Sequence, residues 1–264
     1  MTCAILTPWW RRRLGRTHAA DAAGPAADDV RLLADTPILD WRHGRVRALA
    51  DRARAAAVPG GGDRAFLVAA HRLVSAGINP VYAMDDEQPV SRTLALGRGS
   101  CSQRLAVLEA VARSGGVPTR VRGLLIDGSF WYPRFPRLRL LVPDQVVLAW
   151  PEFHVDGVWT AVSELYGSLD ELRARNPRGF TNAGRQTLFE ALSSTAVDWD
   201  GTAGLCGPQG APDGGCGDHD LSAAVRADLG RFASRDALFA RHGQTLSATA
   251  RAFAGPFLNR RAAA

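Results

Sequence analysis

The stretch LGRGSCSQRLAVLEAVARSGGVPTR, residues 96–120, contains the pattern on which the fold prediction depends. From Cys101 onward, apolar side chains recur at steps of three and four residues, which is the spacing of one face of an α-helix. Gly115 and Gly116 are expected to end this helix, and residues 117–127 (VPTRVRGLLID) have the composition of a β-strand. The apolar face consists of Leu105, Leu108 and Ala112, whereas the other side carries Gln103, Arg104 and Arg113.

Cys101 lies in the first turn of the predicted helix, on its apolar face. Unpaired backbone N–H groups and the positive end of the helix dipole stabilise a thiolate at such a position. The same N–H groups can bind the oxyanion that forms when a thiolate attacks an acyl carbon. Free cysteines are, however, among the most frequently buried residues and often act as small apolar fillers. The local pattern therefore leaves two interpretations of Cys101, a nucleophile and a packing residue.

A β-hairpin is predicted around Asp156-Gly157, a residue pair that favours a tight two-residue turn. The flanking strands are residues 145–155 (QVVLAWPEFHV) and residues 158–166 (VWTAVSELY). Pro151 cannot donate a hydrogen bond to a neighbouring strand, which predicts an edge position or a bulge there. Counting back from the turn gives the expected cross-strand pairs Val155–Val158, His154–Trp159, Glu152–Ala161 and Trp150–Ser163.

The order and spacing of these motifs resemble those of the transglutaminase-like family, which belongs to the papain-like class of cysteine enzymes. The matching residues are Gly99-Ser100-Cys101, Ala106, Leu108 and Gly116-Val117-Pro118-Thr119-Arg120 around the helix, and Ala149, Trp150, Glu152, Gly157 and Trp159 in the hairpin. The resemblance covers roughly residues 63–167. It implies an α+β fold with an antiparallel sheet and a cysteine-bearing helix, flanked by N- and C-terminal helices, and it implies that Cys101 is the nucleophile.

Two positions depart from the family pattern. Leu148 stands where the family has its catalytic histidine, and Ser163 stands where the family has the aspartate that orients it. In the expected register, these two side chains are diagonal neighbours on one face of the sheet. Because leucine cannot take up a proton, protonation of a leaving group needs another acid.

Other histidines are candidates to replace the missing one. His154 projects to the same face as Leu148 and is taken as a catalytic candidate, although six strand residues separate the two by ~20 Å. The alternative interpretation of His154 is a hairpin residue stacked on Trp159. His43 and His71 belong to preceding predicted helices, where surface or core roles are expected.

The substrate is expected to bind near residues 128–144 (GSFWYPRFPRLRLLVPD), which combine aromatic, proline and arginine residues. This segment could grip an anionic or aromatic acyl group. It could also be a proline-braced loop that packs its own aromatic rings. The candidate substrate-binding residues are Trp131, Arg134, Leu148, Trp150, Glu152 and Ser163, with Arg137 and Arg139 as further arginine anchors.

The composition narrows the classes of partner. The 264-residue chain has a formal net charge of +6, and arginine supplies all of the positive charge in this count because there is no lysine. Acidic residues are interspersed with the arginines and no nucleic-acid recognition motif occurs, so no nucleic-acid partner is predicted. No stretch approaches the ~18 uninterrupted apolar residues of a membrane helix, and the apolar run of residues 1–18 precedes its arginines, the reverse of a secretory signal. We therefore expect a cytoplasmic protein that does not bind a membrane.

The chain has four cysteines, Cys3, Cys101, Cys206 and Cys216. They are too few and too scattered for a disulfide framework in a chain of this length. Cys206 and Cys216 lie near Asp218 and His219, but the cysteines are not the close pair of a zinc knuckle. A flexible loop is the preferred interpretation of this segment, and neither a metal nor a cofactor is predicted.

Three regions are predicted: a helical N-terminal region (1–62), the transglutaminase-like core (63–167) and a helical C-terminal region (168–264) with a glycine-rich loop at 200–218. The resulting hypothesis is cysteine-dependent acyl transfer, amide condensation or hydrolysis by an atypical triad. The substrate would be a small-molecule or peptide acyl or amide compound, with bacterial specialised metabolism as a suggested setting. The alternative is a catalytically degenerate member of the family that acts as a binding or scaffolding module. The sequence makes no prediction of the oligomeric state.

Overall fold

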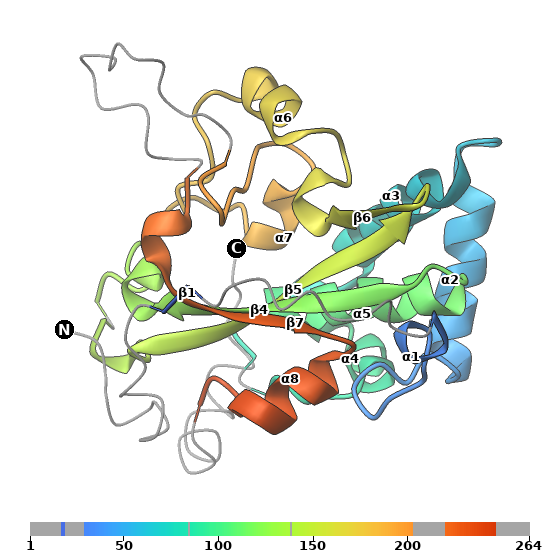
Figure 1. The fold of residues 1–264 in the computed structure, drawn as a ribbon, viewed down its shortest axis with the longest axis horizontal. Coiled ribbons are helices and arrows are strands. Elements are labelled where there is room, and N and C mark those ends of the chain that lie inside the picture. Colours follow the sequence, from blue (N-terminus) through green and yellow to red (C-terminus); the bar gives the residue numbers. More distant parts are fainter. Residues whose placement is uncertain (1–16, 19–28, 84, 138, 203–219, 247–264) are drawn as a thin grey trace.

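The computed structural model describes residues 17–18, 29–83, 85–137, 139–202 and 220–246 (Figure 1). Within these residues, the largest sheet has five strands in the order β1-β7-β4-β5-β6. The β7–β4, β4–β5 and β5–β6 pairs are antiparallel, and the short β1 lies parallel to β7. The predicted antiparallel sheet is thus confirmed. Its strands are β1 (Thr17–His18), β4 (Thr119–Asp127), β5 (Gln145–Val155), β6 (Val158–Ala161) and β7 (Val225–Phe232).

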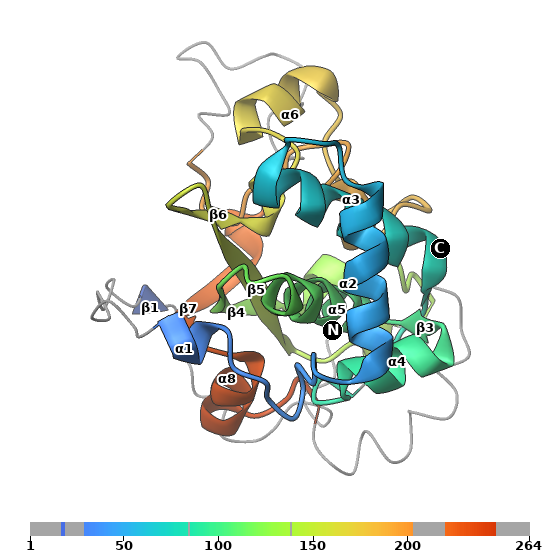
Figure 2. The ribbon, with the colours of Figure 1, turned by 90° about the vertical axis from the view of Figure 1, so that its right-hand side faces the viewer.

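Helices cover the sheet, and α5 lies between the sheet and an outer group of helices (Figure 2). The outer group is α2, α3 and α4, while α8 packs against β4 and β7. A second, smaller sheet pairs β2 (Asn79–Pro80) with β3 (Arg98–Gly99). The helices are α1 (Asp29–Leu32), α2 (Gly44–Ala56), α3 (Gly62–Gly77), α4 (Val90–Leu96), α5 (Cys101–Ser114), α6 (Leu169–Arg175), α7 (Leu188–Ala191) and α8 (Arg235–His242). Short 3₁₀ helices are η2 (Gly128–Trp131), η3 (Arg139–Leu141), η4 (Val162–Glu164) and η5 (Ser222–Ala224).

The α5 helix begins at Cys101, as predicted, but it is buried on all sides. Every residue from Gln103 to Arg113 is buried, including those of the polar side. The charged side chains are paired inside the protein. Arg104 contacts Glu190, and the Glu109 carboxylate lies 2.6 Å from Arg235. The helix is therefore the centre of the core, and its polar side meets other elements.

The predicted hairpin is confirmed at its turn. Asp156 and Gly157 both have positive φ angles, 54° and 79°, as a tight hairpin turn requires. The expected pairs from Val155–Val158 to Glu152–Ala161 are present. The expected pair Trp150–Ser163 is wrong, because β6 ends at Ala161 and the chain then turns into η4. Leu148 and Ser163 are consequently not diagonal neighbours in a ladder.

Pro151 lies where the pairing between β5 and β6 ends. β5 is an interior strand, because β4 pairs with its residues 145–153 without a register shift and β6 pairs on its other side. β6, however, pairs only with residues 152–155. On its β6 side, Pro151 thus has no strand partner, as expected for an edge position, and no bulge occurs there. The first half of β5 leaves this side open to other parts of the chain.

The C-terminal region contains a strand where the sequence suggested a helix. Residues 225–232 form β7, which pairs with the free side of β4. Pairing to β4 overrides the local helical pattern, and Gly230 adopts a φ of 89° next to a register shift in this ladder. Segments far apart in the sequence thus share one sheet. The glycine-rich loop with Cys206, Cys216 and His219, and the N-terminal segment with Cys3, fall outside the described residues.

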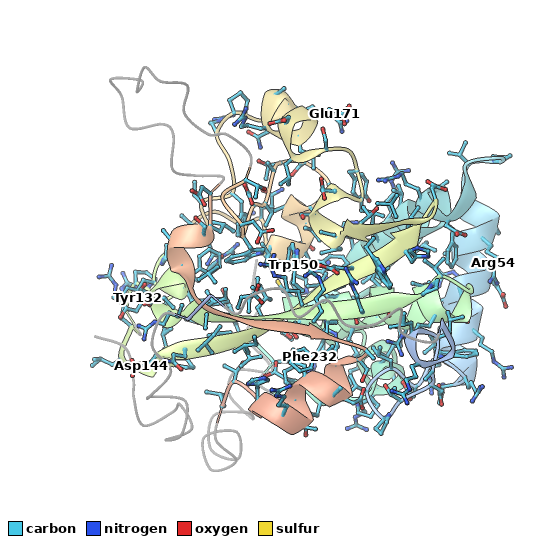
Figure 3. The ribbon with its side chains drawn as sticks, in the orientation of Figure 1. Arg54, Tyr132, Asp144, Trp150, Glu171 and Phe232 are labelled. Carbon is cyan, nitrogen blue, oxygen red and sulfur yellow. The ribbon has the colours of Figure 1, made fainter. Side chains whose placement is uncertain are left out.

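The two faces of the sheet pack against different elements. Trp150 points toward the segments beneath α6 and α7, and Phe232 points toward α8 (Figure 3). Their ring contacts agree with this: Trp150 meets Trp199, and Phe232 meets His242 of α8. None of the helices in the described ranges combines the length and the apolar character needed to cross a membrane.

Candidate functional site

Cys101 is half-buried and lines a cavity of about 200 Å³. The cavity lies beside the start of α5, where the first half of β5, the segment after β4 and the start of α7 meet. Apolar and aromatic side chains dominate its lining, among them Phe130, Trp131, Phe135, Val146, Leu148 and Leu188. Polar lining residues include Asp86, Arg134, Asn182, Thr187 and Thr245.

A capping box fixes the start of α5. The Ser100 hydroxyl accepts a hydrogen bond from the Gln103 backbone N–H at 3.2 Å, and the Gln103 side chain accepts one from the Ser100 N–H at 3.1 Å. The amide of Gln103 also donates to the Asp85 carbonyl at 2.8 Å, which ties the cap to a neighbouring loop. In this arrangement the N–H groups of Cys101 and Ser102 have no acceptor within the helix. They form a site suited to negative charge.

Arg235 holds the first turn of α5 against the sheet. Its side chain is fully buried, and its guanidinium donates to Ser102 Oγ at 3.0 Å, to the Ala149 carbonyl at 3.2 Å and to Glu109 at 2.6 Å. Burial raises the pKa of Glu109, and the positive charge of Arg235 opposes this effect. Arg235, a residue of α8, therefore links Ser102, which follows Cys101, to Ala149, which follows Leu148.

Arg134 closes one wall of the cavity. Its Nε donates to Asn182 Oδ1 at 2.9 Å, and its guanidinium also donates to the Gln186 carbonyl. Asn182, at a positive φ of 53°, in turn donates to the Phe130 carbonyl at 2.7 Å. Arg134, which was predicted to anchor an anionic substrate, therefore also has a structural role. It joins the segment after β4 to the segment before α7.

Four of the predicted site residues meet at this cavity: Cys101, Trp131, Arg134 and Leu148. Trp131 packs edge-on against Phe130, with ring centroids 4.8 Å apart. Leu148, which the resemblance aligns with the family's histidine, is only 5% exposed. Among the described lining residues there is no histidine.

The other four predicted site residues do not line the cavity. His154 packs on Trp159 at 5.1 Å between ring centroids, which matches the alternative interpretation of a hairpin residue. Trp150 is buried against Trp199, and Ser163 is buried in η4. Glu152 is taken up by ion pairs with arginines. The early end of β6 at Ala161 explains only the position of Ser163. Glu152 and His154 pair with β6 as expected and still do not line the cavity.

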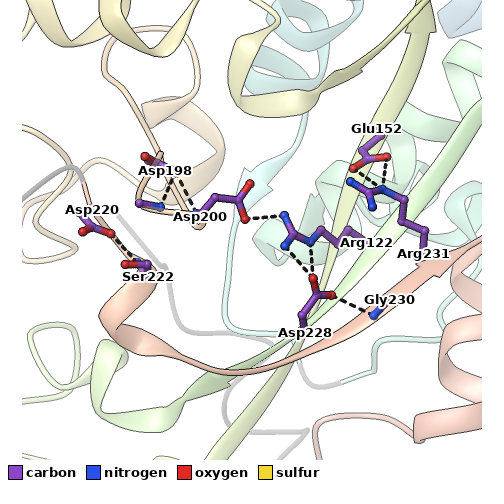
Figure 4. A network of polar contacts seen from close by, with 10 residues as sticks. Arg122, Glu152, Asp198, Asp200, Asp220, Ser222, Asp228, Gly230 and Arg231 are labelled. Atoms are coloured by element: carbon purple, nitrogen blue, oxygen red, sulfur yellow. Dashed lines mark hydrogen bonds and ion pairs between the residues drawn. The ribbon is translucent and has the colours of Figure 1, made fainter. Parts of the chain in front are cut away.

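Glu152 belongs to a network of arginines and carboxylates on the sheet (Figure 4). It accepts hydrogen bonds from Arg231, at 3.2 Å, and from Arg120. Next to it, Arg122 contacts Asp228 at 2.7 Å and also contacts Asp200. The network joins β4, β5 and β7 to the segment around residue 200. These contacts make Glu152 a residue that holds the strands together.

The remaining arginine candidates lie outside the cavity lining. Arg137 and Arg139 are exposed, and the Arg139 guanidinium lies 5.3 Å from the ring centroid of Tyr132. His43 caps α2, because its Nδ1 accepts the Arg45 N–H at 3.2 Å.

His71 supports the cavity from behind. Its ring stacks on Phe189 of α7 at 4.3 Å, its Nε2 lies 2.8 Å from the Phe189 carbonyl, and its Nδ1 lies 2.9 Å from the Tyr166 hydroxyl. Because a carbonyl can only accept, Nε2 carries the proton and Nδ1 accepts from the hydroxyl. Burial lowers the pKa of His71 to about 4. The neutral ring thus fixes α7, whose first residue, Leu188, lines the cavity.

The structure adds an acidic residue that the sequence did not single out. Asp86 lines the cavity, and its Oδ2 accepts the Thr245 N–H at 3.0 Å. The Thr245 hydroxyl accepts a hydrogen bond from the backbone N–H of Val147 at 3.3 Å, on the side of β5 that β6 does not cover. The only signal in the sequence was an acidic turn, residues 85–87. In the part of the chain that the structure describes, no group of histidine, cysteine and carboxylate side chains is arranged to hold a metal ion.

Part of the chain is similar to a known protein family. Residues 47–163 match the model of a family described as the transglutaminase-like superfamily. Among solved structures, the chain is similar to a candidate cysteine protease from Cytophaga hutchinsonii, at 14% sequence identity and a TM-score of 0.37. That alignment covers 57% of this chain and 46% of the other, so it spans less than half of that protein. No curated protein matches the chain. The segment that matches the family model, residues 47–163, includes both Cys101 and Leu148.

Proposed function

We propose that this chain, which contains a transglutaminase-like domain, uses Cys101 for acyl transfer to, or hydrolysis of, a small acyl substrate. The observation that carries the proposal is the position of Cys101. Its side chain lines an apolar cavity while its backbone begins a buried helix whose first N–H groups face no intrahelical acceptor. A nucleophile, an oxyanion site and a space for an acyl group therefore meet at one residue.

The chemistry follows from this arrangement. The Cys101 thiolate attacks the acyl carbon, and the carbonyl electron pair moves onto oxygen. The N–H groups of Cys101 and Ser102, rigidly held by the capping box, are the donors available to that oxyanion. Collapse of the intermediate expels the leaving group and leaves the acyl group on sulfur. Water or a second nucleophile then releases it, which gives hydrolysis or transfer.

A binding module is the second candidate function, and one observation favours it. Leu148 takes the place of the family's histidine, and among the described lining residues no imidazole replaces it. In this case the cavity would bind a small apolar ligand without forming a bond to Cys101. The two candidates differ in a covalent step, which makes them separable by mass.

The test uses an activated ester, p-nitrophenyl phenylacetate, whose phenolate leaves without help from an acid. Intact and peptide mass spectrometry would follow the addition of one phenylacetyl group, with Cys101→Ala as the matched control. The proposal expects a burst of p-nitrophenol and an adduct on Cys101 that the control lacks. Saturable ligand binding without an adduct would instead support the binding module.

A further inference from the structure

We infer that the acyl donor of this site is a thioester of a small apolar acyl group, and not an amide. This inference rests on the proposed function and assigns its substrate class. Two features of the cavity lead to it: the groups available for proton transfer, and the size and chemistry of the space next to Cys101.

The leaving group of the donor determines whether acylation of Cys101 needs an acid. An amide releases an amine, which must gain a proton as the carbon–nitrogen bond breaks, and a positioned acid normally supplies it. At the position of the family's histidine this cavity has Leu148. Arginine, present as Arg134, does not give up its proton in proteins, and the Asp86 carboxylate accepts a hydrogen bond from the Thr245 N–H. The lining therefore suits a leaving group that departs without a proton.

A thioester has such a leaving group. Cys101 sulfur forms a bond to the acyl carbon, the donor's carbon–sulfur bond breaks, and the donor sulfur leaves as a thiolate with the bonding electron pair. Sulfur replaces sulfur on the acyl carbon, so the exchange needs no oxidant and no proton donor. The oxyanion of the intermediate is held by the N–H groups at the start of α5, as in the general reaction.

Among the described lining residues, Tyr82 is a further group that could act as an acid. Tyr82 packs its ring against Phe135, with centroids 4.5 Å apart. A phenol can donate a proton, although it holds that proton tightly near neutral pH. Tyr82→Phe is therefore part of the experiment below.

The cavity selects the acyl group by size and polarity. A cavity of ~150 Å³ lined by aliphatic and aromatic side chains is enough to bind benzene. The present cavity, at about 200 Å³ and lined by residues such as Phe130, Trp131 and Leu188, therefore suits a single ring or a short alkyl chain. A negatively charged acyl group would lose its hydration against this lining, whose cation, Arg134, already donates to Asn182 and to the Gln186 carbonyl. Phenylacetyl and hexanoyl groups fit these limits, whereas a folded peptide segment does not.

The experiment compares two donors with the same acyl group: the N-acetylcysteamine thioester of phenylacetate and its p-nitroanilide. The rate at which Cys101 becomes acylated is followed by mass and divided by the rate for free N-acetylcysteine in the same buffer. The expected result is an enhancement of about 100-fold or more for the thioester, in the range that oxyanion donors supply, and no enhancement for the anilide. An enhancement for the anilide equal to or above that for the thioester would overturn the inference, and its loss in Tyr82→Phe would identify the acid.

Controls separate this inference from the proposed function. If the activated ester acylates Cys101 but the thioester does not, the inference fails and the proposed function stands. If neither reacts, both fail. Hexanoyl and succinyl thioesters test the lining without any substitution, and we expect the succinyl group to react at least about 10-fold more slowly because its carboxylate must be desolvated. Faster reaction of the succinyl donor would overturn the assignment of an apolar acyl group.

Discussion

Replacing His71 by glutamine is expected to remove part of the protein's sensitivity to acid. His71 is 2% exposed, and burial lowers its pKa from 6.5 to about 4. The unfolded chain regains the ordinary value, so between these two pH values the unfolded state binds a proton that the folded state does not. The stability contributed by the neutral ring is therefore complete above about pH 6.5 and is lost as the pH falls toward 4. Each pH unit in this window corresponds to ~1.4 kcal/mol, so about 2 kcal/mol is lost by about pH 5.

The assay is urea unfolding of both proteins at about pH 7.5 and about pH 5. The free energy of unfolding of the wild-type protein should fall by about 2 kcal/mol more than that of His71→Gln, although the variant is less stable at neutral pH. Tyr166→Phe serves as a control, because it removes the hydroxyl near Nδ1 but keeps the buried imidazole. It should retain most of the acid sensitivity. Equal losses in the wild-type protein and His71→Gln would refute the reasoning.

Three further substitutions test the site. Ser100→Ala removes the capping box, and it should lower the free energy of unfolding by ~1 kcal/mol and slow the alkylation of Cys101; an unchanged alkylation rate would show that the cap does not matter to the thiol. Arg235→Met leaves Glu109 buried without its partner and should destabilise the protein by ~3–5 kcal/mol in chemical unfolding. The double variant Arg235→Met/Glu109→Leu should recover most of that loss. No recovery would contradict the claim that the unpartnered Glu109 carboxylate causes it. Leu148→His places an imidazole in the cavity and should speed iodoacetamide labelling of Cys101 near neutral pH, whereas Leu148→Gln should not. Equal rates in these two variants would show that the position does not face the sulfur productively.

The elements that the sequence predicted well carry their signals locally. The start of α5 is marked by a serine cap and Cys101, and its end by two glycines. The hairpin turn is marked by Asp156-Gly157, and its first pairs follow from counting. Such signals act through the backbone of a few neighbouring residues, so they hold whatever the rest of the chain does.

The elements that the sequence missed depend on distant partners. β7 is a strand because it pairs with the edge of β4 that β5 does not occupy. The sequence of residues 225–232 has no pattern that predicts this pairing. The turn of the chain into η4 after Ala161 cuts short a ladder that counting alone would extend. This single departure explains why Trp150 and Ser163 are not aligned as expected.

The candidate site was predicted only in part, because some of its residues lie on locally marked elements and others reach it through contacts between distant segments. Cys101 and Leu148 sit on predicted elements, and Trp131 and Arg134 lie in a segment of suggestive composition. Asp86 and Thr245 reach the cavity from segments that are 159 residues apart in the sequence, through loop packing that has no sequence pattern.

The most direct test of the account is the rate at which iodoacetamide labels Cys101 in the folded protein, mapped by peptide mass spectrometry. The same rate in urea provides the reference, and Cys101→Ala confirms the assignment of the peptide. We predict that Cys101 is labelled near neutral pH in the folded protein, because its side chain lines a cavity beside the first N–H groups of α5. Labelling that occurs only after unfolding would contradict it and would make Cys101 a packing residue.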